Sequence, residues 1–143
     1  MFTVDASVHI NSLNPAEAGS PASRVFLERV YRRPRAVCSP TLLFVEIAAA
    51  VARALGDAER GLAFARAVRG LPEQIWVPLD DALADEAGRM ASECRLRGAD
   101  AVYAAVARRH GTTLVTRDRQ QLERLCRVLP VLTPEEALER LEE

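Results

Sequence analysis

Short apolar runs alternate with longer amphipathic runs along the chain, which is the pattern of strands separated by helices. We predict strands at residues 2–4, 36–38, 75–77 and 113–115, with a fifth, edge strand within 128–132. Helices are predicted over 20–33, 41–55, 57–69, 81–97 and 99–110, then one turn after Asp118 and a terminal helix opened by 133–136. Strands joined by such long connections form a mostly parallel sheet covered on both faces. We therefore expect one α/β domain over residues 1–143, with three α/β/α layers.

Helix ends are assigned from residues that cap or break helices. Ser39 and Pro40 have the chemistry of an N-cap and a first helical residue, and Gly56 closes the long helix that they would open. Gly98 divides the helical pattern between 81 and 110 into two helices. Thr133 is followed by proline and two acids, which favours a helix start there.

The composition is that of an ordinary folded domain, with 49% hydrophobic and 27% charged residues and a net charge of −1. No apolar run reaches the roughly 18 residues that span a bilayer. All basic residues except His9 and His110 are arginines, which excludes a P-loop and a catalytic lysine. The three cysteines are widely spaced and form no zinc or disulfide pattern. We expect a cytoplasmic protein without membrane association.

Four acidic residues occupy positions that solvated surface charge does not explain well. Asp5 follows the first strand and Asp118 follows the strand at 113–115, at the strand ends where ligands bind in open α/β sheets. Glu46 has apolar neighbours three and four residues away, so its carboxylate lies on an apolar helix face. Asp100 is the only acid at the head of a strongly apolar helix. Carboxylates in such surroundings are costly unless they are paired or bind a metal.

A group of four carboxylates favours Mg²⁺ or Mn²⁺, which prefer oxygen ligands. Such an ion lowers the pKa of a bound water and neutralises charge on a phosphodiester, so the residue types fit phosphate-ester hydrolysis. Structural roles remain open for three of the acids: Asp118 can cap a helix, Asp100 can favour a helix dipole, and Asp5 can be a turn residue. Glu46 has the weakest structural explanation.

The segments around these acids resemble the PIN-domain nucleases, and specifically the VapC-type toxins of bacterial and archaeal toxin–antitoxin pairs. The matching stretches are residues 4–7, 45–47, 98–101 and 114–118. Their order and spacing agree with the family over essentially the whole chain. The resemblance implies a single PIN-like nuclease domain with a parallel sheet between helices and acids gathered at one edge.

The resemblance also implies roles for individual residues. The catalytic acids would be Asp5, Glu46, Asp100 and Asp118. Asp5 and Asp100 would be the principal ligands of Mg²⁺ or Mn²⁺, with Glu46 and Asp118 acting through water or orienting the attacking water. Ser7 and Thr116 would support the site by hydrogen-bonding the acids or the metal's waters.

The partners that the resemblance implies are an RNA substrate, a cognate antitoxin and a second copy of the chain in a homodimer. The helices at 41–55 and 20–33 are expected to wall the antitoxin groove. Arg117 and Arg119 are candidates for RNA phosphate contacts or for plain surface, and Trp76 is expected in the core. A non-catalytic PIN-like module that binds RNA or protein is the alternative function, against which the retention of all four acids argues.

Overall fold

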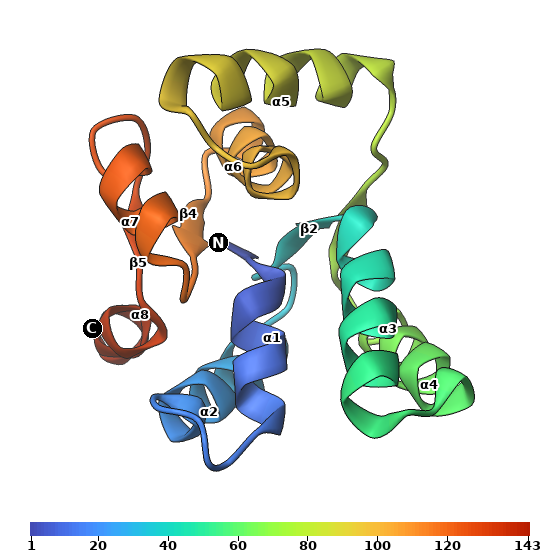
Figure 1. Ribbon diagram of the computed structural model, residues 1–143. Helices are drawn as coiled ribbons and strands as arrows, with labels where there is room; N and C mark the ends of the chain where they lie inside the picture. The colour runs from blue at the N-terminus through green and yellow to red at the C-terminus, as the bar shows by residue number, and fades with distance from the viewer.

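A sheet of short parallel strands runs through the middle of the computed structural model, which describes all residues 1–143 (Figure 1). Strand β1 (Phe2–Val4) pairs with β4 (Thr113–Val115), which pairs with β5 (Val131–Leu132). Strand β2 (Cys38–Pro40) pairs with β3 (Ile75–Val77). A bridge between Phe2 and Val37 connects the two groups, so the strand order is β3-β2-β1-β4-β5. Every pairing is parallel, as predicted.

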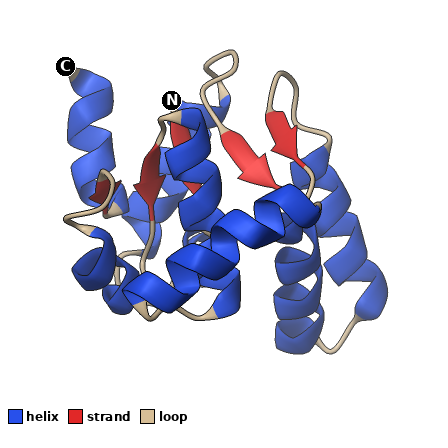
Figure 2. Cartoon of the chain, turned by 90° about the horizontal axis from the view of Figure 1, so that it is seen from above, coloured by secondary structure: helices blue, strands red, loops and turns tan.

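Eight helices surround the strands: α1 (Ala6–Leu13), α2 (Ser20–Tyr31), α3 (Leu42–Leu55), α4 (Ala58–Arg69), α5 (Asp81–Cys94), α6 (Gly98–His110), α7 (Arg119–Leu125) and α8 (Pro134–Glu142). In Figure 1, α5 and α6 lie on one side of the strands and α1 and α2 lie on the other. Figure 2 shows the short strands embedded among the more extensive helices. This arrangement confirms the predicted three-layer α/β/α class. None of the helices is both long enough and apolar enough to cross a membrane.

Helix α6 is the central support of the sheet. Every residue from 101 to 107 is buried, and four of these seven are alanines, whose small side chains let a helix pack closely on several neighbours. Its apolar residues belong to the larger core, which also contains Leu43, Ile47 and Leu114. The first turn of α6, which carries Asp100, is thereby held at a fixed position relative to β1 and β4.

A second core lies where β1 meets α2 and α8. Phe26 of α2 is fully buried and packs edge-to-face on Phe2 of β1, with ring centroids 5.5 Å apart and an interplanar angle of 85°. Val4 and Val115 contribute from the paired strands, and Ala137 from α8. This core fixes the end of β1, after which Asp5 follows.

Helices α3 and α4 form an antiparallel hairpin whose backbones approach closely at Gly61. A Cβ atom at this position would lie 2.6 Å from the carbonyl oxygen of Ala48, which is closer than real Cβ contacts come. A glycine is therefore needed where α4 crosses α3. The close packing holds α3, and with it Glu46, against the rest of the domain.

Three local predictions were wrong. Helix α1 was not predicted at all, although Asp5 caps it. Strand β2 covers residues 38–40 rather than 36–38, so Ser39 and Pro40 pair with β3 instead of opening α3, which begins at Leu42. Helix α5 ends at Cys94, and Gly98 is the first residue of α6 rather than a break between helices. The helix start predicted at Thr133 is present, and it is a capping box with Glu136 as its acidic partner.

Candidate active site

The four predicted catalytic acids meet in one pocket. Asp5, Glu46, Asp100 and Asp118 line a cavity of ≈ 270 Å³ together with Ala6, Ser7, Ile10, Arg97 and Ala99. The acids come from four separate places in the chain: the end of β1, the middle of α3, the first turn of α6 and the start of α7. The structure therefore brings together every acid that the sequence singled out.

Asp5 is held rigidly at the bottom of the pocket. Its backbone is extended, and its Oδ2 accepts hydrogen bonds from the backbone N–H of Ser7 at 3.1 Å and from the Thr116 hydroxyl at 3.3 Å. The side chain thus caps α1 while it faces the other acids. Burial raises the pKa of Asp5, and the hydrogen bonds from Ser7, Thr116 and Gln121 oppose this rise.

Ser7 and Thr116 form a hydroxyl pair behind Asp5. The Ser7 Oγ lies 3.3 Å from the Thr116 Oγ1 and accepts a hydrogen bond from the backbone N–H of Arg117 at 3.0 Å. The Thr116 Oγ1 also accepts from the backbone N–H of Asp118 at 3.0 Å. These two residues therefore join the end of β4 to the start of α1, and they set the separation between Asp5 and Asp118.

Asp100 and Asp118 face each other across the ends of α6 and α7. Asp118 caps α7 by accepting from the backbone N–H of Gln121 at 3.0 Å, and the side-chain amide of Gln121 donates to Asp100 at 3.0 Å. Asp118 thus has both a structural role and a pocket role, because the cap uses only one of its two carboxylate oxygens. Burial raises the pKa of Asp100, and the negative charges of Asp5 and Asp118 raise it further.

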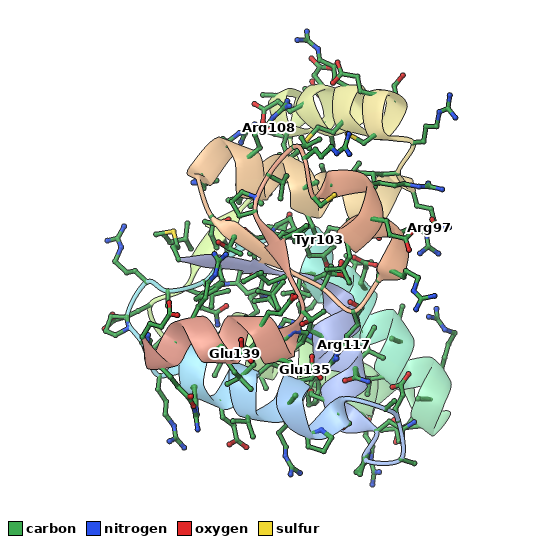
Figure 3. The ribbon with its side chains drawn as sticks, turned by 90° about the vertical axis from the view of Figure 1, so that its left-hand side faces the viewer. Arg97, Tyr103, Arg108, Arg117, Glu135 and Glu139 are labelled. Atoms are coloured by element: carbon green, nitrogen blue, oxygen red, sulfur yellow. The ribbon has the colours of Figure 1, made fainter.

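Arg97 was not singled out by the sequence, yet it is the basic side chain of this pocket. Its Nε lies 3.2 Å from the Oδ2 of Asp100, and its Nη2 lies 2.5 Å from the Oδ2 of Asp118. Figure 3 shows Arg97 at the edge of the molecule, whereas Tyr103 of the same helix lies inside it.

Glu46 carries the pocket's unpartnered oxygen. Its Oε1 is buried and accepts no hydrogen bond, and the hydroxyl of fully buried Tyr103 also lacks a partner. Burial raises the pKa of Glu46, and the charges of Asp5 and Asp100 raise it further. An orphaned buried oxygen is unfavourable unless a proton, a water or a cation satisfies it.

The oxygen donors fit a hard divalent cation in chemical type. Three of the four acids have pKa values raised by burial, and a cation in the pocket would relieve the repulsion among them. No three acidic, histidine or cysteine side chains lie close enough together to coordinate a metal ion without rearrangement. The ion pairs of Arg97 occupy oxygens that such a cage would need.

A Glu46→Gln protein should unfold at a temperature a few degrees higher than the wild type in the presence of a chelator at neutral pH. Because the pKa of Glu46 is higher in the folded than in the unfolded protein, the protonated carboxyl stabilises the fold at pH values below the ordinary carboxyl pKa. This stabilisation is lost as the pH rises through the pKa of Glu46 in the folded protein, where the buried group becomes charged. The amide keeps the shape without the charge. Thermal melts at several pH values should show the advantage shrinking as the pH falls toward the range where Glu46 is protonated. Glu93→Gln, which changes an exposed residue of α5, should show no such gain.

Arg117 is committed to internal bonds. Its guanidinium donates to the Ser23 hydroxyl at 2.9 Å and to the Gly19 carbonyl at 2.6 Å, and it pairs with Glu135 at 2.8 Å. Figure 3 shows Arg117 and Glu135 close together. Gly19 has φ +79°, and a Cβ there would lie 2.6 Å from the guanidinium carbon. These contacts match neither of the two roles considered for Arg117, RNA contact or plain surface, because the guanidinium ties the segment after β4 to α2 and α8.

The chain is similar to a known family and to several solved structures. A family model described as PIN domain matches residues 2–128. The toxin VapC20 from Mycobacterium tuberculosis, described as cleaving the sarcin–ricin loop, superposes with a TM-score of 0.69 at 20% identity and covers 83% of this chain and 91% of its own. PAE2754 from Pyrobaculum aerophilum has a TM-score of 0.67 at 25% identity, covering 99% and 94% of the two chains. FitAcB from Neisseria gonorrhoeae has a TM-score of 0.69 at 20% identity, and the match covers 94% of this chain and 99% of its own. No curated protein matches the sequence.

Proposed function

The chain belongs to the PIN domain family, and from this premise we propose that it is a metal-dependent ribonuclease that acts as the toxin of a type II toxin–antitoxin pair. The family predicted from four short motifs is thereby confirmed, and its structural neighbours include VapC- and FitB-type toxin domains. The observation that carries the proposal is the convergence of four acids from four separate elements in one small pocket. The proposed substrate class, RNA, is supported by the likeness to a neighbour described as a sarcin–ricin loop cleaving toxin.

In the proposed mechanism Asp5 and Asp100 would hold Mg²⁺ or Mn²⁺, and the chain's other groups would position the reacting water. A bound ion would lower the pKa of a water and neutralise charge that develops on the phosphodiester. The free Oε1 of Glu46 can accept a hydrogen bond from the attacking water and then its proton, because burial and neighbouring charges favour the protonated carboxyl. Ser7 and Thr116 keep Asp5 in place through the hydrogen bonds to its Oδ2.

Incubating the purified protein with RNA and with DNA of the same sequence, in the presence of Mn²⁺, tests the assignment. Cleavage of RNA alone supports a ribonuclease. Binding of RNA without cleavage would support the non-catalytic module instead, and cleavage of both polymers would contradict the proposed substrate class.

We assign the antitoxin to an apolar groove that adjoins the active site. The groove has a volume of ≈ 610 Å³ and is lined mainly by α1 and α3, with Phe64 contributed by α4. Ile10, Leu13 and Leu55 are partly exposed along it. Ile10 also lines the acidic pocket, so the two surfaces are continuous. An apolar helix of a partner would cover the groove, and a basic side chain beyond it would reach the acids.

Of the two expected walls, α3 lines this proposed groove and α2 does not. Leu27 and Tyr31 of α2 line a neighbouring cavity with His9, and Phe64 lines both. Helix α1, which was not predicted, stands between α2 and α3 (Figure 1), so the role of α2 as a second wall stays a prediction. The homodimer stays a prediction, which sedimentation velocity would test.

Leu13→Glu should abolish co-purification with the product of the adjacent short reading frame when the two are expressed together. The substitution places a charge in the apolar groove, where a partner helix would have to desolvate it. The matched control is Leu79→Glu, because Leu79 has the same exposed fraction, 43%, but lies outside the groove. Equal recovery of the partner with both variants would place the antitoxin elsewhere.

A further inference from the structure

Arg97 pairs with two acid oxygens that another cation could also bind. Within Asp100, Oδ1 accepts from the Gln121 side chain and Oδ2 pairs with Arg97. Within Asp118, Oδ1 caps α7 and Oδ2 pairs with Arg97. A cation that enters the pocket through these carboxylates therefore meets oxygens already taken by the guanidinium.

The bridge made by Arg97 is easily broken. The Arg97 side chain is 68% exposed, compared with 13% for Asp100 and 19% for Asp118. Its residue is the N-cap of α6, but the side chain makes no capping hydrogen bond. The guanidinium faces solvent and makes no side-chain bond other than those to the two acids, so it can leave them without breaking the packing of the core.

A guanidinium displaced from the acids has a second partner in the phosphodiester of the substrate, because the side chains that line the pocket are mostly negative. Four carboxylates line the pocket and Arg97 is its one basic lining residue. A phosphodiester carries a negative charge and would be repelled by the acids unless cations face it. A guanidinium at the rim matches a phosphate geometrically through paired N–H donors.

We propose that Arg97 exchanges partners during the reaction cycle. In the cation-free protein it bridges Asp100 and Asp118 and closes the pocket to metal. When Mg²⁺ or Mn²⁺ binds at Asp5 and Asp100 and neutralises the acids, the guanidinium would leave the two Oδ2 atoms and bind the phosphodiester of the RNA beside the pocket. This inference rests on the proposed function, because it requires a metal and an RNA substrate at the same site.

The exchange predicts effects of opposite sign on two measurements of an Arg97→Gln protein. If the bridge is closed in roughly nine-tenths of the molecules, the apparent metal affinity of the wild type is lowered about tenfold. Calorimetric titration of chelator-treated protein should therefore show Arg97→Gln binding Mn²⁺ about tenfold more tightly than the wild type. At saturating Mn²⁺ the same variant should cleave RNA with a kcat/KM roughly tenfold or more below the wild type, because the phosphate contact is lost.

Arg95→Gln is the matched control. Arg95 lies two residues earlier in the same connection, is exposed, and forms no ion pair with an acid, so the substitution removes an equal charge nearby. Its Mn²⁺ affinity and its kcat/KM should stay close to the wild-type values.

If the proteins bind Mn²⁺ and cut RNA, two results overturn the exchange alone. One is a Mn²⁺ affinity of Arg97→Gln equal to that of Arg95→Gln. The other is tighter Mn²⁺ binding by Arg97→Gln with an unchanged kcat/KM. If none of the three proteins binds Mn²⁺, the exchange and the proposed function fail together. The Mn²⁺ titration is independent of activity, so the two failures are distinguishable.

Discussion

Replacing Asp5 with Asn is expected to lower the rate of RNA cleavage by roughly 10³-fold, about 4 kcal/mol of transition-state stabilisation, without unfolding the protein. Asp5 is the most buried of the four acids, with 5% of its surface exposed, and is a proposed ligand of the metal. The amide removes the negative charge that holds a cation. It can still accept the hydrogen bond from the backbone N–H of Ser7, because Asn is as good an N-cap as Asp.

The matched control for this experiment is Asp80→Asn. Asp80 caps α5 in the same way, accepting from the backbone N–H of Leu83 at 2.9 Å, but it does not line the acidic pocket. Both variants should give circular dichroism spectra and melting curves close to those of the wild type. Single-turnover cleavage by Asp5→Asn at a rate comparable with Asp80→Asn would remove Asp5 from the catalytic set.

Phe26→Ala is expected to have the largest effect on stability, a loss of about 3–5 kcal/mol. Native domains are stable by only about 5–15 kcal/mol, so this loss removes a large share of the total. The Phe26 ring is fully buried and packs on Phe2, and its removal leaves a cavity directly beneath β1. Urea denaturation monitored by circular dichroism measures the change.

The loss of stability should grow with the side-chain volume that a substitution at Phe26 removes. Phe26→Leu keeps much of that volume and should cost well under half as much. Leu79→Ala, at a half-exposed site outside this core, should change the unfolding free energy by less than about 1 kcal/mol. Equal losses for Phe26→Ala and Leu79→Ala would show that the second core does not support β1.

The alternation of strands and helices could be predicted from the sequence because it depends on local periodicity. Two boundaries, the end of β2 and the start of α3, could not, because they depend on pairing with β3. Ser39 and Pro40 have the chemistry of a helix start, yet they pair with Trp76 and Val77 of β3. Their contacts across the sheet outweigh the local preference. Trp76 is only partly buried, so the predicted core position is met in part.

Helix α1 could not be predicted from local preference because polar residues are spread along it. Ser7, Asn11 and Ser12 all favour non-helical hydrogen bonds in isolation. In the folded chain Asn11 bonds instead to the Ala18 carbonyl and to the Ser23 hydroxyl of α2. The signal that was available is Asp5 itself, since an N-cap residue at the end of a strand also marks the start of a helix.

The acids of the site could be found from the sequence, whereas the groups that hold them could not. The acids stand at strand ends or on apolar helix faces, which are properties of position along the chain. Gln121 and Arg97 matter only because the fold sets the start of α7 beside the start of α6. Such a meeting of two helix ends leaves no trace in local periodicity. Tyr103 likewise gives no signal in the sequence, because only the fold brings its buried hydroxyl near Glu46.

RNA cleavage by chelator-treated protein, measured before and after Mn²⁺ is added back, tests the metal-dependent ribonuclease most directly. The proposed mechanism predicts no cleavage above background in the chelator, recovery of cleavage as Mn²⁺ is titrated, and no recovery in Asp5→Asn. Because the acids alone carry only repelling charge, they cannot stabilise a phosphodiester transition state without a cation. Cleavage that continues at the full rate in the chelator, or that returns equally in Asp5→Asn, would contradict the central claim.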